Sequence, residues 1–441
     1  EYPHKLKSRE RVEWTVTLWD ENDHEGETSE TAFFETGLLS ASDFTAKWIS
    51  GNYHVNKKKR YPVDCFKKQF NAQNVAKARL YITACGLYEA KINGKRVGNF
   101  VLAPGHTDYT KRIQLQTYDV TDLLNDGGNE ITVELADGWY RGSCGAWGLK
   151  NQYGTQTKLY AQLEITDKSG NKAIIGTNNS WKWSNDGKIR FADNKDGEIV
   201  EAWREPSYSG FAKEVKCDVL PVSSNNVPVT EHERFSVKNV IKTPSGAKVL
   251  DFGQNIAGYI SFAVTAKKGQ KIKLRFGEMF DENGEFTQKN IQCANKKRTK
   301  VTPLQQIEYH CTDGLNEYKT KFAIFGFQYV LIESDVEWKA VDFTAIAVYS
   351  DMEETLSFNS SNELLNKLVD ATRWSAKNNH ADVPTDCPTR ERHGWTGDAQ
   401  IFCDTAAYLF NYAPFARKYV ADMIDGQRKN GKFRQITPKG G

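Results

Sequence analysis

The period of the apolar residues changes near residue 355, and this change constrains the fold more than any other feature. Up to about residue 350, apolar and polar residues alternate in short runs, which is the pattern of β-strands. Clear runs lie at 12–18, 80–82, 113–115 and 131–135. Beyond residue 355 the apolar residues recur at helical spacing. We therefore predict several all-β modules followed by an all-α region.

Within the β region, one pair of runs has the form of a hairpin. Residues 260–264 and 272–276 both alternate, and Lys267-Lys268-Gly269-Gln270 lies between them. A glycine-containing turn between two alternating runs predicts paired neighbouring strands. Many short strands with turns indicate β-sandwiches in series. Breaks near residues 40–50 and 222–230 indicate joins between modules.

Three helices are expected in the last part of the chain. Ser360 and Glu363 form a capping-box pattern ahead of a helix whose apolar residues begin at Leu364. A second helix is expected from about Asp398, and Pro414 suits the first position of a third. Because no strand intervenes, this part is predicted to be the opening of an all-helical domain, not a complete one.

Composition excludes several classes of protein. The 441 residues carry 59 Lys and Arg against 56 Asp and Glu, a net charge of +3, which gives no support to a nucleic-acid-binding domain. No run approaches the roughly 18 apolar residues that span a bilayer. The eight cysteines fit no zinc spacing, so mostly free thiols and no metal site are expected. Residue 1 is Glu and no signal-peptide pattern follows, so the expected location is either the cytoplasm or the periplasm of a bacterium.

The segment 382–398, between the first two predicted helices, is the main site candidate. It contains the carboxylates Asp386, Glu391 and Asp398, with Trp395 between the last two. Paired carboxylates beside an aromatic ring are what glycosidic hydrolysis needs. One carboxyl donates a proton to the leaving oxygen, the others bind sugar hydroxyls, and the ring packs on the sugar.

Glu391 is the candidate for the proton donor. Neighbouring Asp386 and Asp398 would favour its protonated form, whereas Arg390 and Arg392 would oppose it if they paired with Glu391. We therefore expect the two arginines to engage the aspartates or the substrate and to leave Glu391 unpaired.

Three other interpretations use the same residues. The charges are also compatible with an ion-paired, solvated loop that caps a helix. Cys387 with His393 would make a nucleophile and base, although six residues of separation say little about their distance in space. His393 with Asp386 and Asp398 would make a metal site, but this set of ligands is unspecific.

The loop also carries a family signature. Asp386-Cys-Pro-x-Arg, then Glu391 and Gly394-Trp395-Thr396-Gly397-Asp398, resembles the signature of bacterial α-L-rhamnosidases, glycoside hydrolase family 78. Further segments resemble the modules of that family, in the family's order: 34–39, 86–89, 92–98, 102–105, 117–121, 137–142, 251–255 and 325–330. The resemblance covers nearly the whole chain.

The resemblance implies an architecture for each part of the chain. The implied modules are a partial fibronectin- or Ig-like β-sandwich at 1–45, a galactose-binding-like jelly roll at 46–228, a β-sandwich at 229–352, and the first part of an (α/α)6 catalytic barrel at 353–441.

The resemblance also implies roles for the loop residues. Glu391 matches the general acid, and Asp386, Arg390, Trp395 and Asp398 match positions that line the rhamnose subsite. The family is inverting, with a general base far downstream, and no residue of this chain matches that base. The implied activity is hydrolysis of terminal α-L-rhamnosyl bonds in glycans or glycosides, without a cofactor. The alternative is a non-catalytic carbohydrate-binding or structural protein.

One aromatic cluster lies outside this loop. Trp139, Tyr140 and Trp147 occupy a glycine-rich stretch of the jelly-roll-like module. They suit a second sugar-binding surface, although aromatic residues in a β-sandwich are more often part of its core.

Overall fold

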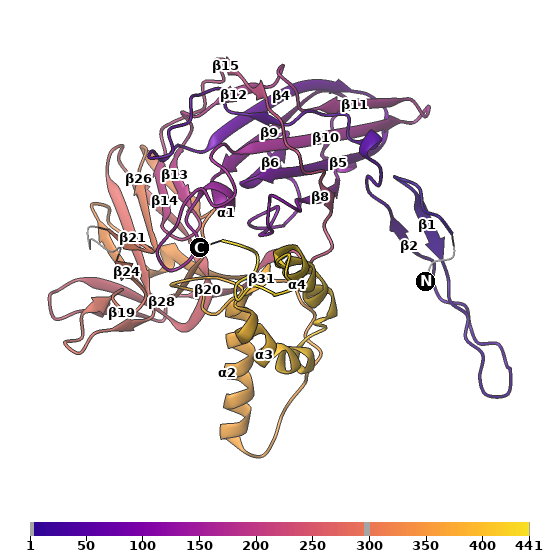
Figure 1. Cartoon of the computed structure of the whole chain (residues 1–441). Coiled ribbons are helices and arrows are strands. Elements are labelled where there is room, and N and C mark those ends of the chain that lie inside the picture. Colours follow the sequence, from indigo (N-terminus) through magenta and orange to yellow (C-terminus); the bar gives the residue numbers. More distant parts are fainter. Residues whose placement is uncertain (1–3, 295–299, 441) are drawn as a thin grey trace.

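The computed structural model describes residues 4–294 and 300–440. Figure 1 shows β-sheets over most of the chain, with the helices of the last ninety residues beside them. This confirms the predicted fold class, β-modules followed by the start of a helical domain. Between residues 4 and 40 the regular pairing is an antiparallel ribbon of β1 (Arg11–Trp14) and β2 (Ala32–Glu35), so the strand predicted over 12–18 ends at Trp14.

The jelly roll consists of two sheets packed face to face. Its first sheet has the order β16 (Lys213–Glu214), β3 (Ile49–Ser50), β10 (Lys158–Asp167), β5 (Val75–Cys85), β8 (Gln114–Asp119) and β17 (Val222–Ser223), with β11 (Lys172–Gly176) also on β10. Its second sheet has the order β15 (Gly210–Phe211), β12 (Lys182–Ser184), β4 (Asp64–Ala72), β9 (Gly127–Ala136), β6 (Leu87–Ile92) and β7 (Lys95–Arg96). The single-turn helix α1 (Gly138–Arg141) follows β9.

The third sheet is shared between two parts of the sequence. Its order is β13 (Ile189–Asp193), β14 (Gly197–Glu201), β26 (Gln306–His310), β21 (Lys271–Gly277), β28 (Phe325–Ser334), β20 (Lys248–Ala266), β29 (Phe343–Ser350) and β18 (Val229–Ser236), with β19 (Asn239–Lys242) and β27 (Gly314–Lys319) also on β20. Strand β14 pairs in parallel with β26, so residues from within 46–228 extend the sheet of the following module. One continuous apolar core runs through both modules as a result.

The predicted hairpin at residues 260–276 is wrong. The turn exists, because the N–H of Gln270 bonds the carbonyl of Lys267 at 3.1 Å. However, β20 and β21 are not neighbours, since β28 lies between them and pairs with both. Strand β20 pairs with β27 at this end. A local turn signal cannot reveal that a strand fifty residues later inserts between its two arms.

Short elements complete the β region and the loop that follows it. The two-stranded ribbons are β22 (Met279–Phe280) with β23 (Phe286–Thr287), β24 (Cys293–Ala294) with β25 (Val301–Thr302), and β30 (His380–Ala381) with β31 (Val383–Pro384). Single 3-10 turns lie at Ala41–Asp43, Thr121–Leu123 and Ala340–Asp342.

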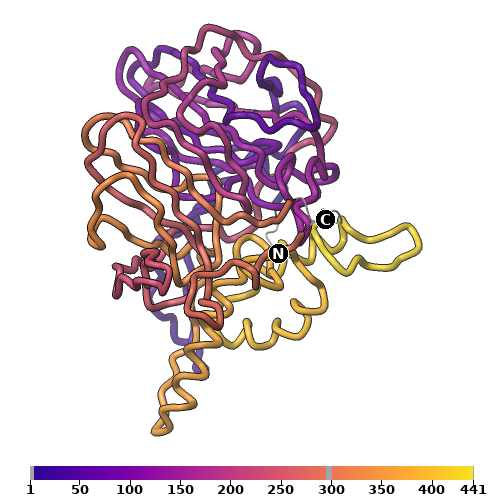
Figure 2. Tube along the Cα trace, turned by 90° about the vertical axis from the view of Figure 1, so that its left-hand side faces the viewer, coloured from indigo at the N-terminus to yellow at the C-terminus, as the bar shows by residue number. Residues whose placement is uncertain are grey.

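Three helices follow the last strand of the large sheet: α2 (Glu363–Asn379), α3 (Thr396–Leu409) and α4 (Ala413–Gly426). The expectation that no strand lies between them is wrong, because the short ribbon of β30 and β31 separates α2 from α3. The predicted cap is shifted, since Asn362 caps α2 by accepting the N–H of Leu364 at 2.9 Å. Pro414 lies in the first turn of α4, as expected. Figures 1 and 2 show α2 extending away from the sheets. The helices have their own small core, around Ala406, Leu409 and Phe415.

Candidate functional site

The predicted site loop joins α2 to α3 and is fixed by contacts with distant parts of the chain. Asp382, buried and with φ of 69°, is at the centre of these contacts. Its carboxylate accepts hydrogen bonds from the amide of Asn226 (2.8 Å) and the ammonium of Lys418 (2.8 Å), and from the backbone N–H of His106 (2.5 Å). The jelly roll, the linker at residue 226 and α4 therefore hold one end of the loop.

Arg392 holds the other end. Its guanidinium is buried and donates to the carbonyls of Asn194 (2.6 Å) and Ile324, and to the side-chain oxygen of Gln305 (2.6 Å). The expectation that Arg392 engages an aspartate or the substrate is wrong, because it binds carbonyl and amide oxygens of the β-modules. Burial lowers the pKa of Arg392 to about 10, within the range where the group stays charged at neutral pH.

Glu391, the predicted acid, is half-buried next to Arg392. The indole N–H of Trp395 donates to its Oε2 at 2.8 Å, and its own backbone N–H donates to the sulfur of Cys387 at 3.3 Å. Within residues 4–294 and 300–440, neither flanking arginine forms an ion pair with Glu391. The side chain of Arg390 is exposed, and its backbone carbonyl accepts a hydrogen bond from the ammonium of Lys195 at 2.6 Å.

Asp386 lies close enough to Glu391 for their charges to interact. Burial raises the pKa of Asp386, the backbone N–H of His393 on its Oδ1 (3.1 Å) lowers it, and the charge of Glu391 raises it further. Asp386 and Asp398, in the first turn of α3, line one pocket of about 270 Å³. The other lining residues are Ser375, Asn379, His380, Pro384, Thr385, Ala399, Ile401, Phe402 and Tyr412. The structure thus brings Asp386, Asp398, Glu391 and Trp395 to one end of α3, while Arg390 points to solvent beside them.

The two alternatives that use His393 have little support in this geometry. Burial lowers the pKa of His393 to about 4, so its ring is neutral near pH 7, and burial raises the pKa of the Cys387 thiol. No hydrogen bond joins the two side chains in the described part of the chain. Across residues 4–294 and 300–440 no group of three or more His, Cys, Asp or Glu side chains is arranged to hold a metal ion.

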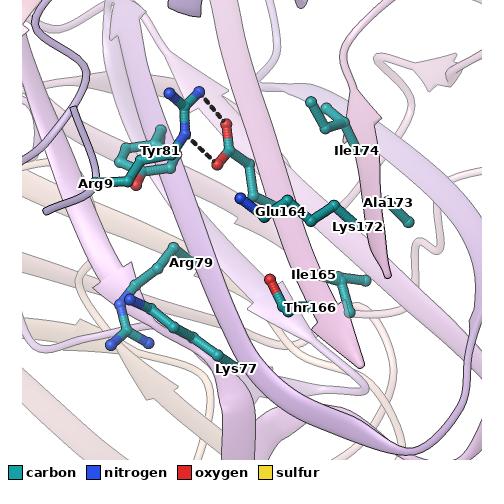
Figure 3. A pocket seen from close by; sticks show the side chains of 10 residues that line it. All are labelled: Arg9, Lys77, Arg79, Tyr81, Glu164, Ile165, Thr166, Lys172, Ala173 and Ile174. Carbon is teal, nitrogen blue, oxygen red and sulfur yellow. Dashed lines mark hydrogen bonds and ion pairs between the residues drawn. The ribbon is translucent and has the colours of Figure 1, made fainter. Parts of the chain in front are cut away.

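A second pocket, of about 380 Å³, lies on the jelly roll and is of a different kind. Figure 3 shows Arg9 of the N-terminal segment bonded twice to Glu164 on β10, at 2.5 and 2.6 Å. Arg79 and Lys77 in the same pocket are paired with Glu35 at 2.9 and 2.8 Å. These ion pairs hold the N-terminal ribbon against the jelly roll, and they leave Arg9, Lys77 and Arg79 already paired with carboxylates.

Sequence reasoning missed two residues that shape the loop. Lys195 and Gln305 are buried and contact Arg390 and Arg392 respectively. They lie 195 and 87 residues away along the chain. No local sequence pattern distinguishes them, because a lysine in a turn and a glutamine before a strand are usually exposed at the protein surface.

Four family profiles match the chain in order. They describe a Rha78A-like N-terminal immunoglobulin domain (residues 1–40), an α-L-rhamnosidase N-terminal domain (73–243), a bacterial α-L-rhamnosidase concanavalin-like domain (241–349) and a bacterial α-L-rhamnosidase 6 hairpin glycosidase domain (353–441). The chain belongs to the α-L-rhamnosidase family.

Known α-L-rhamnosidases match the chain along nearly its whole length. One from Formosa agariphila is 34% identical over 98% of this chain and 48% of its own length, and one from Alteromonas sp. is 33% identical over 98% and 49%. The crystal structure of an Aspergillus terreus α-L-rhamnosidase aligns with a TM-score of 0.90 at 33% identity, over 98% of this chain and 51% of that one. The chain therefore spans about half the length of the α-L-rhamnosidases it matches.

A more distant structure has the same fold. The Streptomyces avermitilis α-L-rhamnosidase complexed with L-rhamnose aligns with a TM-score of 0.91 at 24% identity, over 99% of this chain and 59% of that one. These matches confirm the resemblance inferred from the loop signature and identify the three helices as the start of a 6 hairpin glycosidase domain.

No helix in the described ranges is both long and apolar enough to cross a membrane.

Proposed function

We propose that this chain contributes the acid side of an inverting α-L-rhamnosidase, with Glu391 as the general acid. The observation that carries the proposal is the convergence at one end of α3. Asp386 and Asp398 line a single pocket, and Glu391 lies beside Asp386 with its carboxylate oriented by Trp395. The complex of the Streptomyces relative with L-rhamnose supports a rhamnosyl ligand for this pocket.

The proposal gives each group a chemical role. Glu391 makes no ion pair in the described residues, so its carboxyl group is available to hold a proton and deliver it to the leaving oxygen. Asp386 and Asp398 accept hydrogen bonds from sugar hydroxyls, and the indole of Trp395 gives the sugar a flat apolar wall. Arg390, exposed beside the acid, donates to oxygens of the substrate.

The reaction needs a second carboxylate. An inverting enzyme places its base about 6.5–9.5 Å from the acid, on the opposite side of the sugar, to activate water. We propose that the base comes from outside the 441 residues, because no residue of this chain matches it in the family pattern. On this proposal, the chain alone binds rhamnose and hydrolyses rhamnosides slowly.

The test combines ligand binding with hydrolysis. We expect L-rhamnose to bind, and Asp386→Asn and Asp398→Asn to weaken that binding about tenfold each, as for a lost hydrogen bond to a charged group. Release of a chromophore from an aryl α-L-rhamnoside should fall in Glu391→Gln but not in the control Glu363→Gln, an exposed residue that opens α2. Rhamnose binding without any Glu391-dependent release would favour the non-catalytic alternative. Absence of rhamnose binding would contradict the proposal.

A further inference from the structure

The three aromatic residues that follow β9, Trp139, Tyr140 and Trp147, have different environments in the fold. Trp139 and Tyr140 are buried in the jelly-roll core, where Trp139 stacks on His106 with ring centroids 4.9 Å apart. Trp147, by contrast, is 65% exposed. Its side chain makes no ring contact or hydrogen bond in the described part of the chain. Trp147 therefore offers one large flat apolar face at the surface of the protein.

The turn that carries Trp147 is closed by backbone hydrogen bonds. Cys144 and Leu149 exchange backbone hydrogen bonds of 2.9 and 2.8 Å, and the N–H of Gly148 bonds the carbonyl of Gly145 at 3.0 Å. Gly145 and Gly148 have φ of 68° and 57°, which is the left-handed region that favours glycine. The indole is therefore presented by a closed turn whose conformation its two glycines permit.

A single buried ammonium ties this turn to the proposed acid. Lys195, which is 1% exposed, donates to the carbonyl of Gly145 and to the carbonyl of Arg390, the latter at 2.6 Å. Two oxygens bound to one nitrogen lie within about 6 Å of each other. Trp147 is two residues beyond Gly145, and two residues span at most about 7 Å. The backbone of the turn that carries the exposed Trp147 thus lies next to the backbone of Arg390, the residue before Glu391.

The base of the turn is also fixed. Ser143 donates its backbone N–H to Asp193 at 2.9 Å, and Asp193 is itself paired with Arg60 at 2.7 Å. Further along, the Tyr153 hydroxyl lies 3.2 Å from the position a Cβ would take on Gly440. Figures 1 and 2 show this part of the jelly roll beside the C-terminal end of the described chain. The jelly roll therefore contacts the C-terminal segment of the described chain on this side.

We propose that Trp147 is the wall of a leaving-group subsite, on which the sugar ring or flat aglycone linked to the rhamnosyl unit stacks. The inference rests on the proposed function, because it places the second ring of the substrate relative to Glu391. An indole face suits the apolar face of a pyranose or an aromatic aglycone, and the exposed Arg390 guanidinium supplies donors to its oxygens. The subsite selects substrates by the group that leaves, not by the rhamnosyl unit.

The test compares two ligands by titration calorimetry on the whole 441-residue chain. The ligands are L-rhamnose and an α-L-rhamnosyl-glucose disaccharide, and the measured quantity is the ratio of their dissociation constants. The variants are Trp147→Ala, Trp147→Phe and the control Trp19→Ala, which removes a tryptophan that is 58% exposed in the N-terminal ribbon. We expect the disaccharide to bind about tenfold tighter than rhamnose to the wild type, as stacking on an aromatic ring allows.

In Trp147→Ala this ratio should fall to about one, with rhamnose binding unchanged, while Trp147→Phe keeps most of it and Trp19→Ala keeps all of it. An unchanged ratio in Trp147→Ala, with rhamnose still bound, would overturn the subsite and leave the proposed function intact. Failure of the wild type to bind rhamnose would overturn both.

Discussion

The indole N–H of Trp395 donates a 2.8 Å hydrogen bond to Oε2 of Glu391. The two residues are four apart, and Trp395 is the residue immediately before α3. Its backbone is fixed on the other side, because Trp395 forms an isolated β-bridge with Ile436 and Thr437 donates to the carbonyl of Gly394 at 2.9 Å. The proposed acid is thus oriented by a residue that the last described segment of the chain holds in place.

Replacing Trp395 with Phe should therefore lower rhamnoside hydrolysis more than it lowers the stability of the fold. Phenylalanine keeps the ring but removes the N–H, so the Glu391 carboxylate loses its orienting bond. A hydrogen bond to the protonated acid joins two neutral groups and contributes about 0.5–1.5 kcal/mol, so we expect release from an aryl α-L-rhamnoside to fall about two- to tenfold. The matched control is Trp19→Phe, remote in the N-terminal ribbon, and an equal fall in both variants would contradict the assigned role.

Arg392→Met should destabilise the contact between the loop and the β-modules. The guanidinium satisfies oxygens of Asn194, Gln305 and Ile324, which would be left buried without a donor. We expect a loss of about 3 kcal/mol in stability, seen as a lower Tm and faster proteolysis within residues 382–395. Arg392→Lys should recover little of this, since one ammonium cannot reach three segments. Wild-type proteolysis rates in Arg392→Met would show that the anchor is dispensable.

The helical part should lose stability in acid through His380. Burial lowers the pKa of this ring from its usual 6.5 to about 4, among Phe402, Tyr412 and Phe415. The unfolded chain therefore binds a proton that the folded chain refuses, so stability is lost as pH falls from about 6.5 to about 4. The slope is at most about 1.4 kcal/mol per pH unit for one group.

The measurement is the Tm of wild type and His380→Gln between pH 4 and pH 7. As the pH falls across this window, we expect the Tm of the wild type to decrease more than the Tm of His380→Gln. Comparing the two proteins removes the contributions of other groups, including Asp422, whose pKa burial raises to about 6 and whose effect has the opposite sign. Parallel pH curves for the two proteins would exclude His380 as the source.

The exposed apolar face of the helices should drive self-association. Leu364 and Leu368 on α2 are 75% and 61% exposed, and Ile401 on α3 is 79% exposed. A patch of this kind is unusual on a monomer and favours association or aggregation. We expect Leu364→Lys with Leu368→Lys to lower the associated fraction in sedimentation velocity without lowering the Tm. Lys substitutions at the equally exposed Val341, in the β-sandwich, provide the control. Monodisperse wild-type protein at high concentration would contradict this prediction.

Much of the architecture was decided by the sequence itself. The change from a two-residue to a helical period predicted β-modules before helices, because side-chain burial repeats with the geometry of each element. The density of carboxylates around Trp395 marked the site loop, since local composition is visible without the fold. The loop signature also indicated the family to which the chain belongs.

Other features were decided only by the tertiary structure. Strand β28 separates β20 from β21, and no local turn signal encodes which distant strand is inserted between two arms. Arg392 binds the β-modules and not an aspartate, because its acceptors, Asn194, Gln305 and Ile324, are brought to it from up to 198 residues away. The same holds for Trp139 and Trp147, eight residues apart in one glycine-rich stretch. Packing buried the first and left the second exposed, because burial depends on what the folded chain brings against each side chain.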